Sequence, residues 1–182
     1  MAERTPLYPE HVAAGARMVV FGGWDMPVYY ASALNEHHAV RRGWGVFDVS
    51  HMTVVDVEGP GARAYLRRLL ANDVARLREP GHGLYSCMLD EAGGVVDDLI
   101  AYWLGGERYR VIVNAATRDK DLAWMQAAAA GAAVSVTHRS GVVMIAVQGP
   151  AARSGVAALL PPAIGERTLA LRTFHSLEAG GT

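Results

Sequence analysis

The most regular pattern of apolar and polar positions begins at Thr53. Residues 53–58 alternate as a half-buried strand does, and Gly59-Pro60 ends the alternation. Apolar residues then recur at helical spacing as far as Leu70, and proline is favoured in the first turn of a helix. The pattern therefore predicts a strand, a Gly-Pro turn and a helix.

The next segment alternates between strand-like and helix-like stretches. We predict strands at 84–89, 95–104, 109–114 and 133–137, and a helix at 117–130 that Gly131 closes. Asp119 and Asp121 fall in the first turns of this helix, where the positive end of the helix dipole favours acidic side chains. The order β-α-β-β-β-α-β predicts an α+β fold with mainly antiparallel sheets and flanking helices.

The strand, Gly-Pro and helix pattern occurs twice, because residues 145–153 repeat the pattern of residues 55–63. A strand followed by a helix needs partner strands that cover its apolar face. No closing element is evident after the second copy, so we expect a piece of a longer protein. The alternative is a short protein with a flexible tail.

Residues 1–52 are less regular, since glycines and prolines interrupt a series of aromatic residues. This pattern predicts short elements, long loops and a helix at about 34–42. We expect two subdomains. Residues 53–138 form the β-α-β-β-β-α-β unit, and residues 1–52 together with 139–182 form parts of an incomplete second one.

Composition excludes several function classes. With 17 Lys plus Arg, 18 Asp plus Glu and a net charge of −1, the chain has no electrostatic footprint for nucleic acid or a membrane surface. Neither a secretory signal nor an apolar run of membrane-spanning length is present. The single cysteine, Cys87, cannot form an intramolecular disulfide and is expected to be buried in its strand. We therefore expect a soluble intracellular protein.

Two adjacent carboxylates, Asp97 and Asp98, are the sharpest candidates for chemistry. They follow Gly93-Gly94 near the start of a predicted strand. Because side chains alternate along a strand, Asp98 shares a face with Tyr102, whereas Asp97 points the other way. A carboxylate beside an aromatic ring suits a flat, nitrogen-rich ligand. The ring contacts the face of such a ligand, and the carboxylate accepts hydrogen bonds from its N–H groups. The alternative is a charged strand edge without a site.

The turn at 105–107 decides which residues of the returning strand face Asp98. A three-residue turn sets the pairs Leu104–Arg108, Tyr102–Arg110, Ile100–Ile112 and Asp98–Asn114. A two-residue turn would change the parity and move Asn114 to the opposite face. We predict the three-residue turn, which gathers a carboxylate, a carboxamide and a phenol on one face.

Other reactive side chains give weaker signals. The neighbours His37 and His38 lack the spacing of a zinc-binding helix, and we predict no metal site. Asp48, Ser50 and His51 supply the residue types of a serine hydrolase, but working triads are assembled from separated segments.

Several motifs together resemble the glycine cleavage T protein family. They keep the family's order and lie at 4–8, 15–19, 21–27, 45–52, 84–86, 93–99, 113–116 and 146–150. The most recognisable is Gly45-Val46-Phe47-Asp48-Val49-Ser50-His51-Met52. The resemblance covers the N-terminal half of the family's chain, whereas its later Gly-Tyr-Thr-Gly-Glu and Gly-Ala-Arg-Asp segments are absent.

The resemblance implies a tetrahydrofolate-dependent aminomethyltransferase of the glycine cleavage system. Such an enzyme passes a one-carbon unit from the aminomethyl-lipoyl arm of the H protein to tetrahydrofolate and releases ammonia. The family's key carboxylate matches Asp98, the expected catalytic residue. The positions that match folate contacts are Met52, Tyr85, Asp98, Tyr102, Ile112 and Asn114.

The resemblance further implies the lipoylated H protein as partner, no metal, and the bacterial cytoplasm as location. Because the family's later segments supply further folate contacts, we expect this chain to hold one wall of the pocket and to be inactive alone.

Three other functions stay open. One is a non-transferase folate-binding module of the iron–sulfur assembly type. Another is a folate-linked demethylase, or the C-terminal part of a dimethylglycine- or sarcosine-type dehydrogenase. The last is an α+β structural domain without a site, which the absence of a cavity beside Asp98 and Tyr102 would favour.

Overall fold

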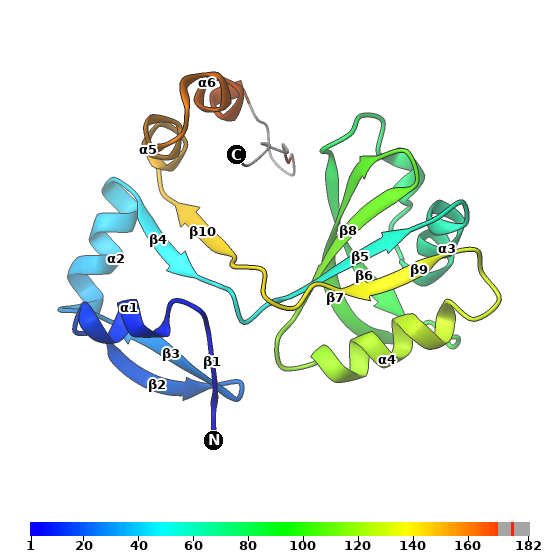
Figure 1. The fold of residues 1–182 in the computed structure, drawn as a ribbon, viewed down its shortest axis with the longest axis horizontal. Helices are drawn as coiled ribbons and strands as arrows, with labels where there is room; N and C mark the ends of the chain where they lie inside the picture. Colours follow the sequence, from blue (N-terminus) through cyan, green and yellow to red (C-terminus); the bar gives the residue numbers. More distant parts are fainter. Residues whose placement is uncertain (171–175, 177–182) are drawn as a thin grey trace. The chain divides into compact units, whose positions relative to one another are not determined.

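The computed structural model describes residues 1–170 and residue 176, and its chain forms two compact units (Figure 1). Unit 1 contains residues 1–51 and 141–170, and unit 2 contains residues 52–140. The fold is α+β with mainly antiparallel sheets, as predicted. The borders lie near the predicted ones, and the status of the units as separate domains stays a prediction.

Unit 2 is a five-stranded sheet in the order β6-β7-β8-β5-β9, with every neighbouring pair antiparallel. Its elements are β5 (Thr53–Glu58), α3 (Ala62–Leu69), the short 3-10 helix η1 (Val74–Arg76), β6 (Gly83–Leu89), β7 (Val95–Gly105), β8 (Arg108–Val113), α4 (Arg118–Ala128) and β9 (Ser135–His138). The predicted order β-α-β-β-β-α-β is confirmed.

Helices α3 and α4 lie on the same side of this sheet (Figure 1). The residues that face them are apolar at every second position, and Val55, Val57, Val111 and Val113 are fully buried. Leu66 of α3 packs into the same core. Each such side chain contributes about 1.5–3 kcal/mol when it leaves water, so this layer is the main source of stability of unit 2.

The turn between β7 and β8 differs from the predicted three-residue loop. Gly105 pairs with Arg108, so the turn has two residues, and Leu104 is an extra residue that bulges out of β7. The predicted pair Leu104–Arg108 is therefore wrong. The bulge restores the parity that the shorter turn removes, and the predicted pairs Tyr102–Arg110 and Ile100–Ile112 are confirmed.

Unit 1 holds two small sheets, in the orders β1-β3-β2 and β10-β4. Its elements are β1 (Glu3–Arg4), α1 (Tyr8–Ala13), β2 (Arg17–Phe21), β3 (Trp24–Tyr29), α2 (Ala33–Arg42), β4 (Gly45–Asp48), β10 (Ile145–Gln148), α5 (Ala152–Leu159) and α6 (Pro162–Ala170). The helix predicted at 34–42 is confirmed. The long loops predicted for residues 1–52 are wrong, because short elements follow one another closely there.

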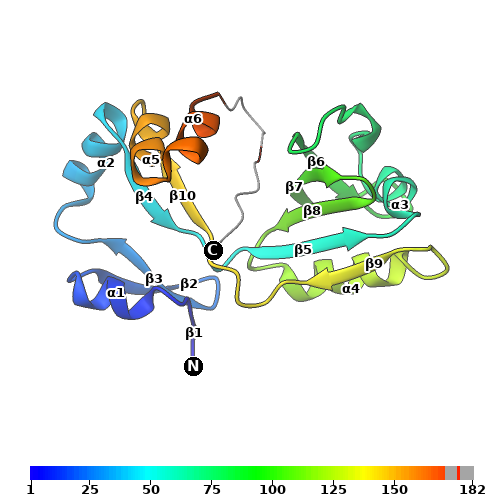
Figure 2. The ribbon, with the colours of Figure 1, turned by 45° about the horizontal axis from the view of Figure 1, so that its top comes forward.

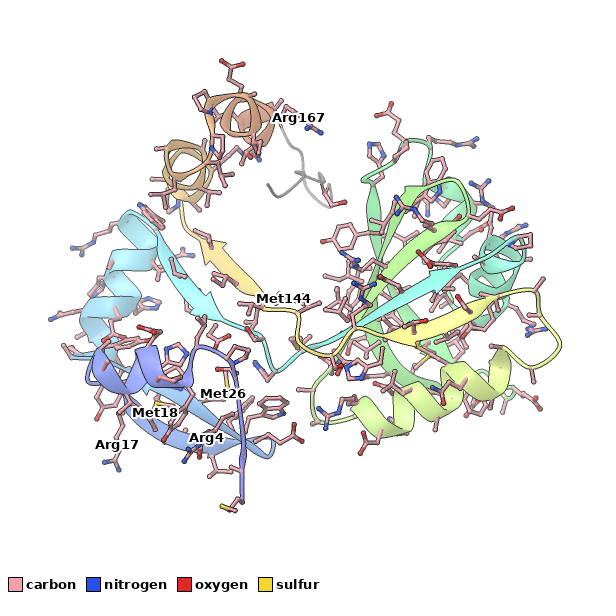
Figure 3. The ribbon with its side chains drawn as sticks, in the orientation of Figure 1. Arg4, Arg17, Met18, Met26, Met144 and Arg167 are labelled. Carbon is pink, nitrogen blue, oxygen red and sulfur yellow. The ribbon has the colours of Figure 1, made fainter. Side chains whose placement is uncertain are left out.

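Long-range polar contacts hold these short elements of unit 1 together. His11 of α1 bridges Asp48 of β4 and the hydroxyl of Tyr30, with both distances 2.9 Å. Arg4 of β1, labelled in Figure 3, forms an ion pair with Asp25 of β3. The Arg4 Nε atom lies 3.2 Å from the Asp25 carboxylate. Polar contacts between side chains therefore help to stabilise unit 1, as apolar packing stabilises unit 2.

The two copies of the Gly-Pro motif adopt the same local structure. Gly59 and Gly149 have φ of 124° and 132°, a region that glycine reaches without a steric penalty. A Cβ at either position would come within 2.6 Å of a backbone oxygen, that of Ala133 for Gly59 and that of Val40 for Gly149. The predicted repeat of strand, Gly-Pro turn and helix is thus confirmed, and both glycines allow a close approach of backbones.

Unit 2 is inserted between two paired strands of unit 1. The chain leaves unit 1 after β4 and returns as β10, which pairs with β4 in antiparallel fashion (Figure 2). The hydroxyl of Ser50 accepts a hydrogen bond from the Met144 N–H at 3.0 Å and lies 3.2 Å from the Met144 carbonyl oxygen. On the side of unit 2, the Arg139 N–H donates to the Val54 carbonyl at 2.9 Å. The outgoing and returning segments therefore run side by side.

In the part of the chain that the structure describes, no helix combines the length and the apolar character that crossing a bilayer requires.

The core of unit 2 leads to a stability prediction. Leu66→Ala should lower the free energy of unfolding by roughly 2–5 kcal/mol, since it leaves a cavity under the sheet. The matched change on the same helix, Arg67→Ala, removes an exposed ion pair with Asp73 and should cost below about 1 kcal/mol. Urea denaturation followed by tryptophan fluorescence measures both. Equal losses would contradict the assignment of this core.

Candidate functional site

The face of the unit 2 sheet opposite α3 and α4 carries most of the predicted site residues. Ile100 of β7 pairs with Tyr85 of β6 and with Ile112 of β8, so these three side chains form a row across the sheet. Asp98 and Tyr102 lie two positions to either side of Ile100 on β7 and share its face. The adjacent strands β6, β7 and β8 thus bring together an acid, two phenols and two apolar side chains.

Both carboxylate oxygens of Asp98 are held by side chains of neighbouring strands. The Tyr85 hydroxyl donates to Oδ2 at 2.8 Å. The amide nitrogen of Asn114, directly after β8, lies 3.3 Å from Oδ1 and 3.3 Å from the Asp98 carbonyl oxygen. The backbone pairing ends at Leu99–Val113, one residue before the predicted Asp98–Asn114 pair, but the two side chains meet as predicted.

Tyr85 and Tyr102 occupy different environments. The side chain of Tyr85 is 51% exposed, and its hydrogen bond to Asp98 raises the pKa of its hydroxyl, because ionisation would place two negative charges together. Burial raises the pKa of Tyr102. A Cβ at Gly83 would come within 2.6 Å of the Tyr102 ring, so the absence of a side chain at Gly83 leaves room for the ring against β6.

Asp97 points to the opposite face, as predicted, but it is part of the same network. It accepts hydrogen bonds from the Asn114 amide at 3.0 Å and from the Thr117 hydroxyl at 2.5 Å. Burial alone raises the pKa of Asp97, but hydrogen bonds from Asp121, Thr117 and Asn114 outweigh it and lower the pKa to about 2. Burial and the contact with Asp97 raise the pKa of Asp121 to about 7.

The sequence reasoning missed Asp121 and Thr117 as members of this network. Asp121 was interpreted only as a charge that suits the first turns of a helix. The signal that identifies it is spacing, because Asp121 precedes the buried Met125 by four residues and so shares its helix face.

Two other predicted residues lie beside this group. Met52 lies immediately before β5 at the start of unit 2 and is half-buried, and its contact with a ligand stays a prediction. Cys87 pairs with Asp98 across β6 and β7 and is half-buried on the open face. Cys87 lies in a strand, as expected, but it is half-buried and not buried, because its strand position faces away from the helices.

The residue types of a serine hydrolase in unit 1 do not form a triad. Asp48 contacts His11 and the Ser50 backbone N–H, and the Ser50 hydroxyl contacts the Met144 backbone. Nor do three potential metal ligands from His, Cys, Asp and Glu gather anywhere among residues 1–170 and 176.

A hollow of about 590 Å³ opens elsewhere in unit 2. It lies beside α3 and α4, and its lining includes Arg68, Leu89 and Trp124 but not Asp98. Asp98 and Tyr102 therefore lie on an open sheet face within unit 2. This hollow is therefore separate from the group around Asp98 and Tyr102.

The order of the motifs, the fold and this constellation agree with a comparison of sequences. Residues 7–182 match the family described as the GCVT N-terminal domain. The chain belongs to this family. Members of a fold family share an architecture, whereas the chemistry of each member depends on the residues of its site.

Among its relatives are proteins named aminomethyltransferase. That of Bordetella petrii is 62% identical over 161 residues, which cover 87% of this chain and 44% of the relative. That of Pseudomonas syringae pv. tomato is 54% identical over 180 residues, which cover 99% of this chain and 50% of the relative. The chain thus spans about half the length of the curated relatives it matches.

A solved structure shows the same fold for a GCVT family protein. The crystal structure of glycine cleavage system aminomethyltransferase T from Bartonella henselae superposes with a TM-score of 0.82 at 36% identity. The match covers 89% of this chain and 45% of that protein.

The hydrogen bond between Tyr85 and Asp98 predicts a titration. Asp98→Asn removes the negative charge, so the pKa of Tyr85 should fall toward the ordinary tyrosine value of about 10. The pKa of Tyr102, which burial raises, should stay where it is. NMR titration of the tyrosine ring carbons measures both. An unchanged pKa of Tyr85 in the variant would contradict the contact.

Proposed function

We propose that this chain carries the Asp98 wall of the folate site in a tetrahydrofolate-dependent aminomethyltransferase of the glycine cleavage system. The observation that carries the proposal is the fixed Asp98 carboxylate, whose two oxygens receive hydrogen bonds from Tyr85 and Asn114. The family membership and the names of the relatives support it.

The side chains around Asp98 suit the pterin ring of a folate. A pterin is flat and rich in nitrogen, so it offers two faces for apolar contact and several N–H groups at its edge. Tyr102 and Ile112 supply apolar surface on the same face as Asp98, and a carboxylate accepts hydrogen bonds from N–H groups. Met52, Tyr85 and Asn114 complete the set of proposed folate contacts.

In the proposed reaction, Asp98 acts by position and charge. It accepts a hydrogen bond from the reacting folate N–H and orients this nitrogen toward the carbon that the lipoyl arm of the H protein delivers. As the carbon–sulfur bond breaks, positive charge develops on the transferred carbon, and the nearby carboxylate stabilises it. Two folate nitrogens form bonds to the carbon in place of the sulfur and the amine. Their two protons leave with the thiol of the arm and with ammonia. No covalent bond to Asp98 is needed.

We further propose that the remaining walls of the site come from chain that lies outside the part matched here. Among the described residues of unit 1, Met26 is the one buried hydrophobic side chain. Large apolar side chains of unit 1, such as Phe21, Val46 and Ile145, are instead exposed. Such surfaces on a soluble protein are usually covered by a partner or by further chain. The isolated 182-residue chain is therefore proposed to be inactive.

The function is tested by Asp98→Asn in the full-length protein, assayed for aminomethyl transfer from the loaded H protein to tetrahydrofolate. The variant should keep its fold and lose on the order of hundredfold or more in kcat, because a preorganised charge is removed. Asp119→Asn, which removes an exposed carboxylate from α4, is the matched control and should keep normal activity. Normal turnover by Asp98→Asn would overturn the proposal.

The contribution of the rest of the protein is tested separately. Calorimetry of the 182-residue chain with tetrahydrofolate should show weak binding or none. Micromolar affinity would show that the wall described here is sufficient for binding and would contradict the proposed need for further chain.

A further inference from the structure

A buried pair of carboxyl groups lies on the covered side of the sheet, behind Asp98. Asp121 of α4 has an exposed fraction of 0%, and its carboxyl group lies close enough to that of Asp97 for each to shift the pKa of the other. Neither oxygen of Asp121 has a hydrogen-bond partner of good geometry among the described residues. The Thr117 hydroxyl lies close enough to lower the pKa of Asp121, but its single proton is directed to Asp97. A buried carboxylate without donors is strongly disfavoured, so this group requires an explanation.

A single proton between the two acids explains the contact. Two ionised carboxylates only accept hydrogen bonds, so a hydrogen bond between them requires that one be protonated. Asp97 already accepts from Asn114 and Thr117, which stabilises its ionised form. Asp121 lacks a donor comparable to Asn114, and the Thr117 proton is directed to Asp97, so the proton belongs to Asp121, which donates to Asp97.

The other charged groups near the pair would not stabilise an ionised Asp121. Lys120 lies 3.9 Å from Oδ1 of Asp121, but its ammonium group is largely exposed and donates to the Val96 carbonyl at 2.6 Å. Asp98 adds another negative charge on the opposite face of β7. An ionised Asp121 would therefore face Asp97 with only a distant, solvated cation as compensation.

The charge state of this pair controls the orientation of Asn114. Because Asp97 is ionised and accepts only, the side chain of Asn114 must turn its nitrogen toward it. The same nitrogen reaches Oδ1 of Asp98. If Asp121 also ionised, repulsion would displace Asp97 and remove one anchor of the Asn114 amide.

We propose that Asp121 is a positioning residue, which in its neutral form donates a hydrogen bond to Asp97 and so fixes Asn114 against Asp98. The role in transfer rests on the proposed function, since it assumes that Asp98 is the reacting carboxylate. The protonation of Asp121 does not rest on that function and is measured on its own.

The first experiment tests the proton on the 182-residue chain without any substrate. Infrared difference spectroscopy between wild type and Asp121→Asn should show a carboxylic-acid C=O band at pH 6 that fades as the pH rises through about 7. Asp119→Asn should leave the band unchanged. The absence of the band at pH 6 would overturn the proposal whatever the enzyme does.

The same chain offers a second readout in its stability. A carboxyl group whose pKa is higher in the folded state than in the unfolded state binds more protons when folded. Wild type should therefore lose stability relative to Asp121→Asn as the pH rises from about 4 through about 7, the folded-state pKa of Asp121. A constant difference across this range would contradict the proposal.

The last experiment tests positioning in the full-length protein through the pH profile of kcat. Asp121→Asn keeps a donor to Asp97 and should retain activity, without the fall in kcat that is expected of wild type above pH of about 7. Asp121→Leu removes the donor at similar volume and should lose on the order of tenfold in kcat at pH 6.5, with a smaller change in KM. Wild-type kcat and an unchanged profile in both variants would overturn positioning, whereas Asp98→Asn alone decides the proposed function.

Discussion

Antiparallel pairing between β7 and β8 is the constraint on which the arrangement of unit 2 depends. It places Tyr102 and Ile112 on the face of Asp98 and aligns the end of β8 with the start of β7. The same pairing turns Leu99 and Val113 toward the helices, where they enter the core. Any slip by one residue would exchange these sets, burying the acid and exposing the core, so the apolar packing and the position of Asp98 are fixed by one register.

The side chain of Asn114 links the two acids that lie on opposite faces of the sheet. This residue lies at the end of β8, where the strand gives way to the segment that leads into α4. Its amide reaches the acid on the open face and the acid on the covered face at once. Asp97 and Asp98 are neighbours whose side chains diverge, yet the carboxamide joins them. In the proposed arrangement, Asp121 of α4 therefore acts on Asp98 through Asp97 and Asn114, without a direct contact.

Much of unit 2 follows from the sequence, because strand alternation and helical spacing are local and strong there. The parity of β7 placed Asp98 with Tyr102, and this needed no tertiary information. The bulge at Leu104 was not predictable, because two turn lengths fit the same glycines. The proton on Asp121 depends on a contact between α4 and β7 that no local pattern contains. In unit 1, strands of four to six residues such as β2, β3 and β4 are held by long-range contacts, and their sequences carry little periodicity.

The side-by-side course of the segments that join the units has an evolutionary and practical consequence. Residues 53 and 139 mark nearly adjacent ends, since Arg139 bonds to Val54 and β5 pairs with β9. A gene segment that encodes such a module can be gained or excised with little disturbance of the host, because both cut ends are already close together. For the same reason the module is a natural candidate for circular permutation, with new termini opened at the exposed β6–β7 turn.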